Sequence, residues 1–201
     1  MAKSFSVPHE KLILASGSPR RSELLAEMGV VFEVITADVE EFASLAPGHP
    51  TPSDLAMANA HAKASAVAKI PQASQCWVLG ADTVVALEDR LFGKPSSSEQ
   101  AREFLQALSG QTHEVITGCA LINRDGREQS FHEVSHVTFK ILTEDVIKRY
   151  LAEVHVLDKA GAYALQEHGD WIIERVEGSH DNVIGLPTEL IEKVFKSVRL
   201  L

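Results

Sequence analysis

Short apolar runs alternate with amphipathic stretches along this chain, and the first such unit predicts a strand, a turn and a helix. Lys11–Ala15 is a brief apolar run with the length of a strand. Ser18 follows at a position suited to a helix cap, and Pro19 fits the first helical residue. An apolar stripe then repeats at helical spacing as far as Gly29, where we expect the helix to end.

Later helices are predicted where a capping residue precedes an amphipathic or alanine-rich stretch. Their predicted starts and ends are Ser53 to about Lys69, Ser97 or Ser98 to Ser109–Gly110, Thr143 to about Ala152, and Pro187 onward. The segment before the first of these, Ala43–Pro52, is rich in proline and glycine and is therefore expected to be a loop.

Strands are predicted where apolar residues form continuous runs or alternate with polar ones. The predicted ranges are Val30–Thr36, Trp77–Leu87 (one bent strand or a pair), His113–Asn123, Arg127–Lys140, Ala160–Gln166 and Asp170–Glu177. Asp125-Gly126 lies between two of them and is a strong hairpin signal. Because helices and strands do not alternate strictly, we expect residues 1–201 to form one mixed α/β domain.

Composition and charge exclude several classes of partner. The formal net charge of −9 argues against broad binding to duplex nucleic acid, which requires a basic face. The apolar runs are far too short to span a membrane. Cys76 and Cys119 lack metal-finger spacing, and Met1–Lys11 is too polar for a secretory signal. We therefore expect a cytoplasmic protein, in which a small polyanion could still bind at a local cluster of basic groups.

The first candidate for such a cluster is Ser16–Arg21, between the first strand and the first helix. Backbone N–H groups at a helix start attract anions, and two arginine forks suit phosphate oxygens. The same residues are also compatible with a capped helix carrying two solvated arginines. A Ser-Pro-basic motif for the DNA minor groove is disfavoured in so acidic a chain. Gly93-Lys94-Pro95 lacks the preceding glycine and following helix of a P-loop.

Two further segments carry polar groups in unusual surroundings. Asp82 interrupts an apolar strand, where a carboxylate is costly to bury unless it is paired, hydrated or bound to metal. It could instead satisfy a turn between two strands. Leu157–Gln166 has small and polar residues suited to a pocket wall, and Gln166 could hydrogen-bond a base edge. Here the alternative is an internal pair between Asp158 and Lys159.

Single charged residues are less informative. Lys63 on a predicted helix and Lys94 before a proline would each ordinarily be surface lysines. Glu40 and Glu41 would ordinarily be solvated in a loop, yet a divalent cation bound to phosphates needs hard oxygen ligands of this kind. The nine histidines show no zinc spacing.

Taken together, these segments resemble the Maf family of nucleotide pyrophosphatases. The matching stretches, in family order from Leu12 to Pro187, are LILASGSPRRSELL, VLGADTVV, GKP, LSGQTHEVITG, VTF, LDKAGAYALQ and GSHDNVIGLP. The resemblance implies a Maf/ITPase-like α/β fold with two lobes, a curved mixed sheet and a deep nucleotide-binding cleft. It also implies hydrolysis of a nucleoside triphosphate to a monophosphate and pyrophosphate, with Mg²⁺ or Mn²⁺ as cofactor.

The resemblance also implies roles for particular residues. Asp82 matches the family's catalytic carboxylate, which would act as general base. Positions that set base specificity correspond to Arg21, Thr83 and Gln166, and positions that hold the triphosphate correspond to Ser16, Arg20, Lys63 and Lys94. Glu40 or Glu41 matches the acidic stretch near the metal. A homodimer is implied by family likeness only.

Three features resemble the branch of the family that acts on dTTP and UTP. They are Arg-Arg after Pro19, the segment Ala81–Thr83, and the segment Asp158–Gln166. The branch acting on 7-methyl-GTP usually has Trp-Arg after the proline, Ser-Asp-Gln at the aspartate, and a glutamate where Gln166 stands. The alternatives are a 7-methyl-GTP-type pyrophosphatase or a nucleotide-binding regulator of cell division. Departures from the family pattern at Glu167, His168, His180 and Thr188 are expected to reshape the pocket rim.

Overall fold

In the computed structural model, which describes residues 11–48 and 50–200, seven strands form a single mixed sheet. The prediction for residues 1–10 lies outside the described part. The strands are β1 (Lys11–Leu14), β2 (Phe32–Val34), β3 (Cys76–Leu87), β4 (Arg90–Phe92), β5 (Thr112–Asn123), β6 (Glu128–Phe139) and β7 (Ile173–Glu177). Their order is β2-β1-β3-β5-β6-β7, with β4 pairing β3. The mixed α/β class is therefore confirmed.

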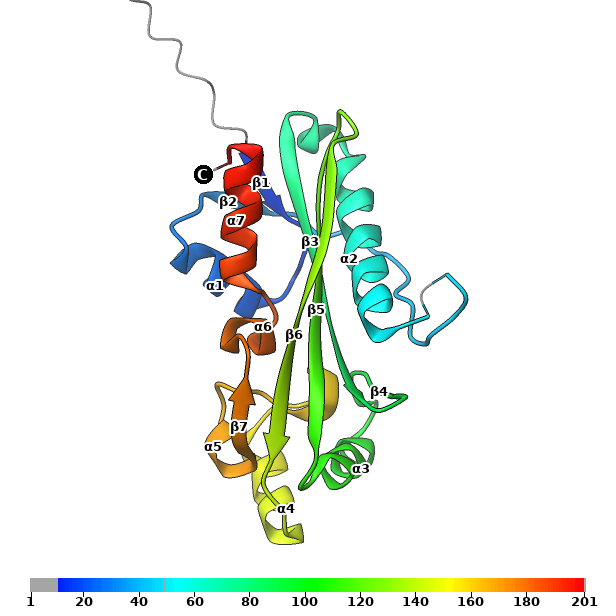
Figure 1. Cartoon of the computed structure of the whole chain (residues 1–201), viewed down its shortest axis with the longest axis vertical. Coiled ribbons are helices and arrows are strands. Elements are labelled where there is room, and N and C mark those ends of the chain that lie inside the picture. The colour runs from blue at the N-terminus through cyan, green and yellow to red at the C-terminus, as the bar shows by residue number, and fades with distance from the viewer. Residues whose placement is uncertain (1–10, 49, 201) are drawn as a thin grey trace, which may run out of the picture.

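The centre of the sheet is formed by β3, β5 and β6, which run most of the length of the molecule (Figure 1). β3 is one continuous strand, antiparallel to β5 and parallel to β1. β5 and β6 form the predicted hairpin around Asp125-Gly126. Most of β3 is buried, and its sequence is therefore a nearly continuous apolar run rather than an alternation of apolar and polar residues.

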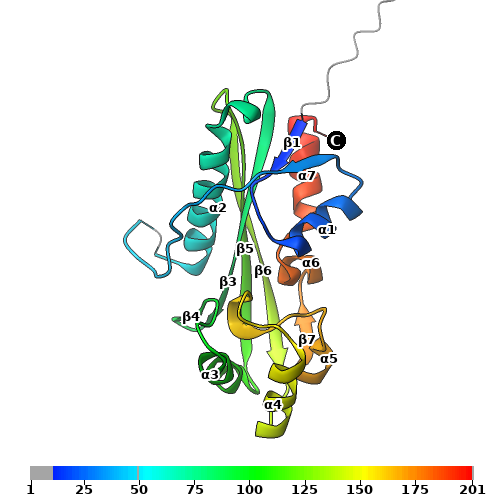
Figure 2. The ribbon, with the colours of Figure 1, turned by 180° about the vertical axis from the view of Figure 1, so that it is seen from behind.

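The helices are α1 (Pro19–Glu27), α2 (Pro52–Ala68), α3 (Ser98–Leu108), α4 (Glu144–Glu153), α5 (Gly169–Ile172), α6 (His180–Ile184) and α7 (Thr188–Val198), with short 3₁₀ turns η1 (Pro71–Ala73) and η2 (Ala160–Ala162). At one end of the long strands α1 and α7 lie on one side and α2 on the other, while α3, α4 and α5 gather at the opposite end (Figures 1 and 2). Each end has its own apolar cluster. One includes Trp77, Leu79 and Phe195, and the other includes Phe139 and Tyr150.

The helix α2 lies directly on β3 and β5 because small residues meet at the contact. A side-chain carbon added to Gly80 would lie 2.2 Å from the Ala60 carbonyl oxygen, and one added to Gly118 would lie 2.4 Å from the Ala56 carbonyl carbon. Ala64 on the next turn of α2 is fully buried as well. This close approach places the polar side chains of α2 beside the middle of β3.

Several predicted boundaries were wrong. Thr51, not Ser53, caps α2, because Thr51 and Asp54 form a reciprocal capping box and Pro52 takes the first helical position. Of the strand predicted for Val30–Thr36, only β2 forms. It is an edge strand, and its pairing is limited because its neighbour β1 has only four residues. His180–Ile184 is a helix that the sequence reasoning missed.

The stretch Ala160–Gln166 was also wrongly predicted, because it is not a strand. It begins with the turn η2, in which Gly161 has a φ of +72°. A side chain on Gly161 would come within 3.2 Å of Val85, so this turn packs tightly against β3. Of the predicted strand Asp170–Glu177, the larger part forms β7, and only its first residues, which belong to α5, are helical.

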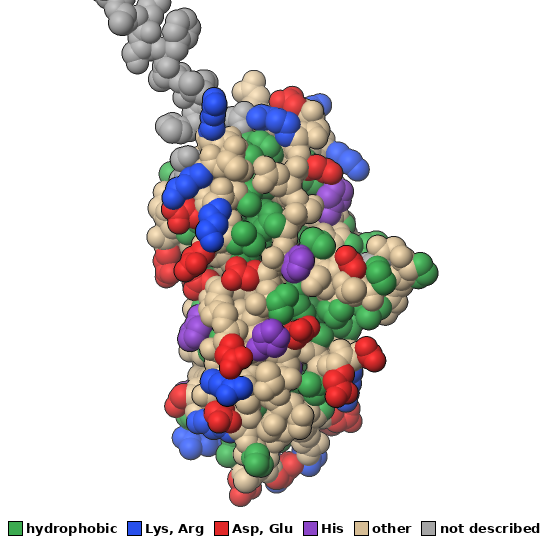
Figure 3. Space-filling model, in the orientation of Figure 1, with side chains coloured by type: hydrophobic (Ala, Val, Ile, Leu, Met, Phe, Trp, Pro, Cys, Tyr) green, Lys and Arg blue, Asp and Glu red, His purple; other side chains and the backbone are tan. Residues whose placement is uncertain are grey.

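The distribution of charged side chains on the surface agrees with the argument from net charge against binding to duplex nucleic acid. On the face shown in Figure 3, lysine and arginine side chains are interspersed with aspartate and glutamate and form no basic stripe. Among the described residues, no helix combines the length and apolar character required to cross a bilayer.

Candidate nucleotide site

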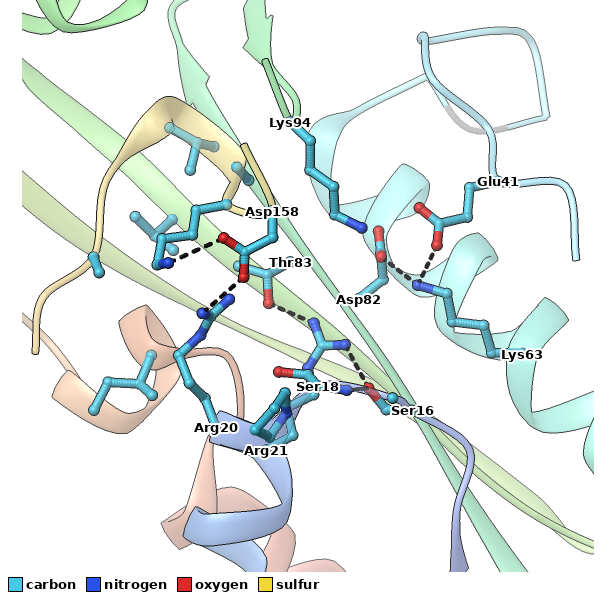
Figure 4. Close-up of a pocket in the computed structure, with 18 of the residues that line it drawn as sticks. Ser16, Ser18, Arg20, Arg21, Glu41, Lys63, Asp82, Thr83, Lys94 and Asp158 are labelled. Carbon is cyan, nitrogen blue, oxygen red and sulfur yellow. Dashed lines mark hydrogen bonds and ion pairs between the residues drawn. The ribbon is translucent and has the colours of Figure 1, made fainter. Parts of the chain in front are cut away.

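A cavity of about 460 Å³ lies where segments distant in sequence meet. Its walls come from the turn between β1 and α1, the segment after β2, the middles of α2 and β3, and the loop around η2 (Figure 4). The sequence-predicted site residues that line it are Ser16, Arg20, Arg21, Glu41, Lys63, Asp82, Thr83, Lys94 and Gln166. Glu40 is not among the lining residues.

Asp82 lies in the middle of β3 and is only 8% exposed, with both carboxylate oxygens engaged. Lys63 Nζ is 2.7 Å from Oδ1, and Asn59 Nδ2 is 3.1 Å from Oδ2. Lys63 Nζ is also 2.9 Å from Glu41 Oε1, so one ammonium joins two carboxylates. Lys94 points into the same space (Figure 4). The alternative of Asp82 satisfying a turn is wrong, because β3 continues through it.

The pKa of Glu41 reflects this arrangement. Burial by itself would raise it, but the hydrogen bond and charge of Lys63, helped by Lys94, outweigh burial and lower it. Glu41 is therefore held as a carboxylate facing the cavity.

Arg21 is not a solvated arginine but a fixed part of the pocket. Its guanidinium donates to the Gly185 carbonyl at 2.8 Å, to Ser16 Oγ at 3.0 Å and to Thr83 Oγ1 at 3.0 Å. Burial lowers the pKa of Arg21, and the nearby charge of Asp82 acts in the opposite direction. All three acceptors are neutral, so the positive charge of Arg21 is not cancelled by a direct ion pair among the described residues.

Thr83 extends this hydrogen-bond network from β3 to the neighbouring strand β5. Thr117 donates to the Asn182 carbonyl at 3.0 Å, so the 2.9 Å contact between Thr83 and Thr117 uses the Thr83 hydroxyl hydrogen. The Thr83 oxygen accepts from Arg21 and therefore keeps one further acceptor position, and Thr83 lines the cavity. Neither Thr117 nor Asn182 was singled out from the sequence, since each is an ordinary polar residue until the strands pair.

The start of α1 lines the cavity, together with the turn before it. Ser18 is at the cap position with extended backbone angles, but its side chain makes no capping hydrogen bond. Instead the Ser18 N–H donates to Ser16 Oγ at 3.3 Å. The position of the cap was predicted correctly and its chemistry was not.

A series of ion pairs connects α1 to the loop around η2. Arg20 is 3.3 Å from Asp158, Asp158 is 3.0 Å from Lys159, and Lys159 is 3.2 Å from Glu167. The internal pair of Asp158 with Lys159, given above as the alternative to a pocket wall, is thus present, and both residues also line the cavity. Glu167, a departure from the family pattern, joins this pair. Gln166 is exposed at the cavity edge, where its amide has no hydrogen-bond partner within the described ranges.

Residues 11–198 match the family model described as Maf-like protein. This chain belongs to the Maf-like family. The Maf-like chain is 46% identical over 190 residues to a protein named dTTP/UTP pyrophosphatase from Bacillus cereus (strain ZK / E33L), covering 94% of this chain and 96% of that one. A protein of the same name from Bacillus anthracis shows the same identity and coverage.

Two solved structures share the fold of this Maf-like protein. One is a HAM1 protein from Coxiella burnetii, with a TM-score of 0.53, 17% identity, and 93% and 98% of the two chains covered. The other is the Staphylococcus aureus Ham1 protein, with a TM-score of 0.54, 14% identity, and 94% and 99% covered. At such low identity these likenesses support the fold alone.

The donor atoms of the Maf-like cavity suit a hard divalent cation. Asp82 and Glu41 offer carboxylate oxygens that are already brought to one cation, the Lys63 ammonium. Over the described ranges, no group of three or more His, Cys, Asp or Glu side chains could hold a metal by itself. This set matches Mg²⁺-type binding, in which one or two carboxylates share the ion with substrate phosphates and water.

Proposed function

We propose that this Maf-like protein is a nucleoside triphosphate pyrophosphatase that hydrolyses dTTP and UTP to the monophosphate and pyrophosphate. The names of its 46% identical relatives support the substrates. The observation that carries the chemistry is the buried Asp82, which faces a cavity lined by Arg20, Arg21, Lys63 and Lys94. A carboxylate beside concentrated positive charge suits a reaction in which water attacks a polyanion.

In this proposal Asp82 orients a water molecule and accepts its proton as the oxygen attacks the α-phosphorus. The bond between the α-phosphorus and the bridging oxygen breaks, and pyrophosphate leaves with that electron pair. The lysines and arginines offset the negative charge that accumulates on the leaving group. Such transfer depends mostly on positioning and charge neutralisation, which these fixed side chains supply.

Asp82 would hold the divalent cation together with the Glu40–Glu41 segment. Glu41 is favoured because it lines the cavity and Glu40 does not. A bound Mg²⁺ or Mn²⁺ would supply further charge neutralisation on the phosphates.

Base choice is assigned to Arg21, Thr83 and Gln166. Arg21 and Thr83 form one hydrogen-bonded unit at 3.0 Å, which gives that wall a fixed shape. The neutral amide of Gln166 can both donate and accept, as a pyrimidine edge requires, whereas a glutamate can only accept.

The test is an assay of purified protein with Mg²⁺ or Mn²⁺ and dTTP, UTP, CTP, GTP and 7-methyl-GTP, with monophosphate and pyrophosphate quantified. We expect pyrophosphate chiefly from dTTP and UTP, and none from Asp82→Asn, which keeps the shape of the side chain. Turnover chiefly of 7-methyl-GTP would move the protein to the other branch. Nucleotide binding without any turnover would favour a regulatory role, for instance in cell division.

A further inference from the structure

Asn59 is a buried amide on α2 that the proposed chemistry does not yet use. It is 3% exposed, and its three hydrogen bonds join two separate parts of the site. Its Oδ1 accepts from the Phe42 N–H at 2.8 Å, and its Nδ2 donates to the Phe42 carbonyl at 3.0 Å. The remaining Nδ2 hydrogen is directed to Asp82 Oδ2 at 3.1 Å.

The segment that Asn59 holds lies between β2 and α2, and near β2 it is tied to the core by Ile35, whose N–H donates to the Leu14 carbonyl. Described residues 35–43 form neither helix nor strand. The Phe42 side chain is 48% exposed, so burial of its ring supplies only part of the anchoring. The Asn59 amide pairs with both backbone groups of Phe42, as a neighbouring strand would. Because Glu41 directly precedes Phe42, this pairing sets where the Glu41 carboxylate can reach.

Lys63 lies one helical turn after Asn59 and therefore on the same face of α2. Lys63 shares Asp82 with Asn59, at 2.7 Å, and also contacts Glu41 directly, at 2.9 Å. Asn59 donates to Oδ2 of Asp82, and Oδ1 therefore stays directed to the Lys63 ammonium. A neutral amide can fix a carboxylate in this way without adding another charge to the site.

We infer that Asn59 is a positioning residue. It orients Asp82 and anchors Glu41, so that both carboxylates face the same cation in the cavity, which is the Lys63 ammonium in this structure. This inference rests on the proposed function, since it assigns Asn59 a role in that reaction. The role inferred for Asn59 differs from that of an ordinary buried asparagine, whose loss would destabilise the fold without acting through Glu41.

The test is a double-mutant cycle of Asn59→Ala and Glu41→Gln, with kcat and KM measured for dTTP and Mg²⁺. Asn59→Ala should lower kcat by roughly ten- to a hundredfold, since small misplacements at a reacting centre cost up to about that much. The double variant should then lie within about threefold of Asn59→Ala, because Glu41 is already misplaced. Effects that simply multiply, or a Glu41→Gln variant with near-normal kcat, would overturn the inference.

Asn123→Ala is the matched control. Asn123 is 7% exposed, and its Oδ1 accepts the N–H groups of Asp125 and Arg127 at 3.1 and 3.0 Å, so it is also a buried amide that clamps backbone. It does not line the cavity. Its loss should lower the Tm, and its effect on kcat should multiply with that of Glu41→Gln.

Asn59→Asp covers the case in which Asn59→Ala does not fold. Aspartate keeps the size of the side chain and the acceptor for the Phe42 N–H. It removes both Nδ2 hydrogen bonds and sets a like charge against Asp82. We expect it to lose at least as much activity as Asn59→Ala, and near-normal kcat would contradict the role assigned to Nδ2.

Hydrogen exchange tests the anchoring without any substrate. Peptides containing Phe42 should exchange faster in Asn59→Ala than in the unmodified protein, while peptides from the β5–β6 hairpin should not change. If the unmodified protein failed to hydrolyse dTTP and UTP, the proposed function would fall and this measurement would still decide the anchoring. Unchanged exchange at Phe42 would overturn it.

Discussion

At the scale of single residues, the site is organised around Asp82, whose two carboxylate oxygens accept hydrogen bonds from Lys63 and Asn59. Asp82 could be singled out because a carboxylate interrupts an apolar run. Its partners Lys63 and Asn59 could not, because a lysine and an asparagine on a helix are usually solvated. The family resemblance supplied Lys63, whereas nothing in the pattern indicated Asn59, whose role depends on the contact between α2 and β3.

The first prediction at this scale concerns Gln166. Gln166→Glu should lower kcat/KM for dTTP relative to GTP by roughly tenfold or more, because a carboxylate cannot donate a hydrogen bond to the pyrimidine edge. Initial rates for both nucleotides at several concentrations measure the ratio. The same change at the exposed Gln129, which does not line the cavity, is the control and should leave the ratio unchanged. An unchanged ratio in Gln166→Glu would refute its role in base choice.

The second concerns His113, which is 1% exposed and 2.8 Å from the Tyr163 hydroxyl. Its Nδ1 has no hydrogen-bond partner within the described ranges, and burial lowers its pKa to about 4. Between pH about 6.5 and about 4 the unfolded chain therefore binds a proton that the folded chain does not. Stability due to neutral His113 is complete above this window and is lost as the pH falls through it, by about 3 kcal/mol.

Urea unfolding between pH 4 and pH 8 measures this effect. His113→Gln should flatten the pH dependence of the free energy of unfolding relative to the unmodified protein, whatever its stability at neutral pH. The exposed His132, replaced by Gln, serves as the control and should keep the original slope. Parallel curves for His113→Gln and the unmodified protein would contradict the assignment.

At the scale of elements, length and periodicity predicted the long strands and the amphipathic helices well. The β5–β6 hairpin follows from two long alternating runs around Asp125-Gly126. The errors fell on short elements such as β2 and η2, where tertiary packing decides the conformation. The predicted strand at Ala160–Gln166 failed because Gly161 turns against β3, a contact that no local pattern records.

The packing of α2 gives a prediction about an element. Gly80→Ala would place a methyl group 2.2 Å from the Ala60 carbonyl oxygen and 2.9 Å from the Ala64 nitrogen, both backbone atoms of α2. The helix must then shift, which should cost about 1–3 kcal/mol. Because α2 carries Asn59 and Lys63, kcat should fall as well. Thermal unfolding and the dTTP assay measure the two effects.

Gly48→Ala is the control for this prediction. A side chain on Gly48 would meet nothing within 4 Å, so stability should change by less than about 0.5 kcal/mol and activity should persist. Equal behaviour of the two variants would show that α2 does not lie as close to β3 as described.

At the scale of the whole molecule, an acidic chain concentrates basic groups in one cavity. The net charge is −9, yet Arg20, Arg21, Lys63 and Lys94 all line the same space. Because the walls come from distant parts of the chain, a bound nucleotide should stabilise the folded protein as a whole.

A dTTP analogue with a non-hydrolysable α,β-methylene bridge tests this. With Mg²⁺ at about 100 times its Kd, it should add about 2.7 kcal/mol and raise the Tm by about 5–10 °C. Thymidine, which lacks phosphates, is the matched ligand and should give a much smaller shift. No shift with the analogue in a thermal unfolding scan would contradict nucleotide binding at this cavity.

The sequence by itself determined the α/β class, the long hairpin and the family, because periodicity, turn chemistry and ordered motifs are local properties of a chain. The tertiary structure decided that Arg21 is held by three neutral acceptors, that Glu41 rather than Glu40 lines the cavity, and that Asn59 links Glu41's segment to Asp82. These last relations depend on strand register and on how closely α2 approaches β3. Both are set by packing between residues far apart in the sequence.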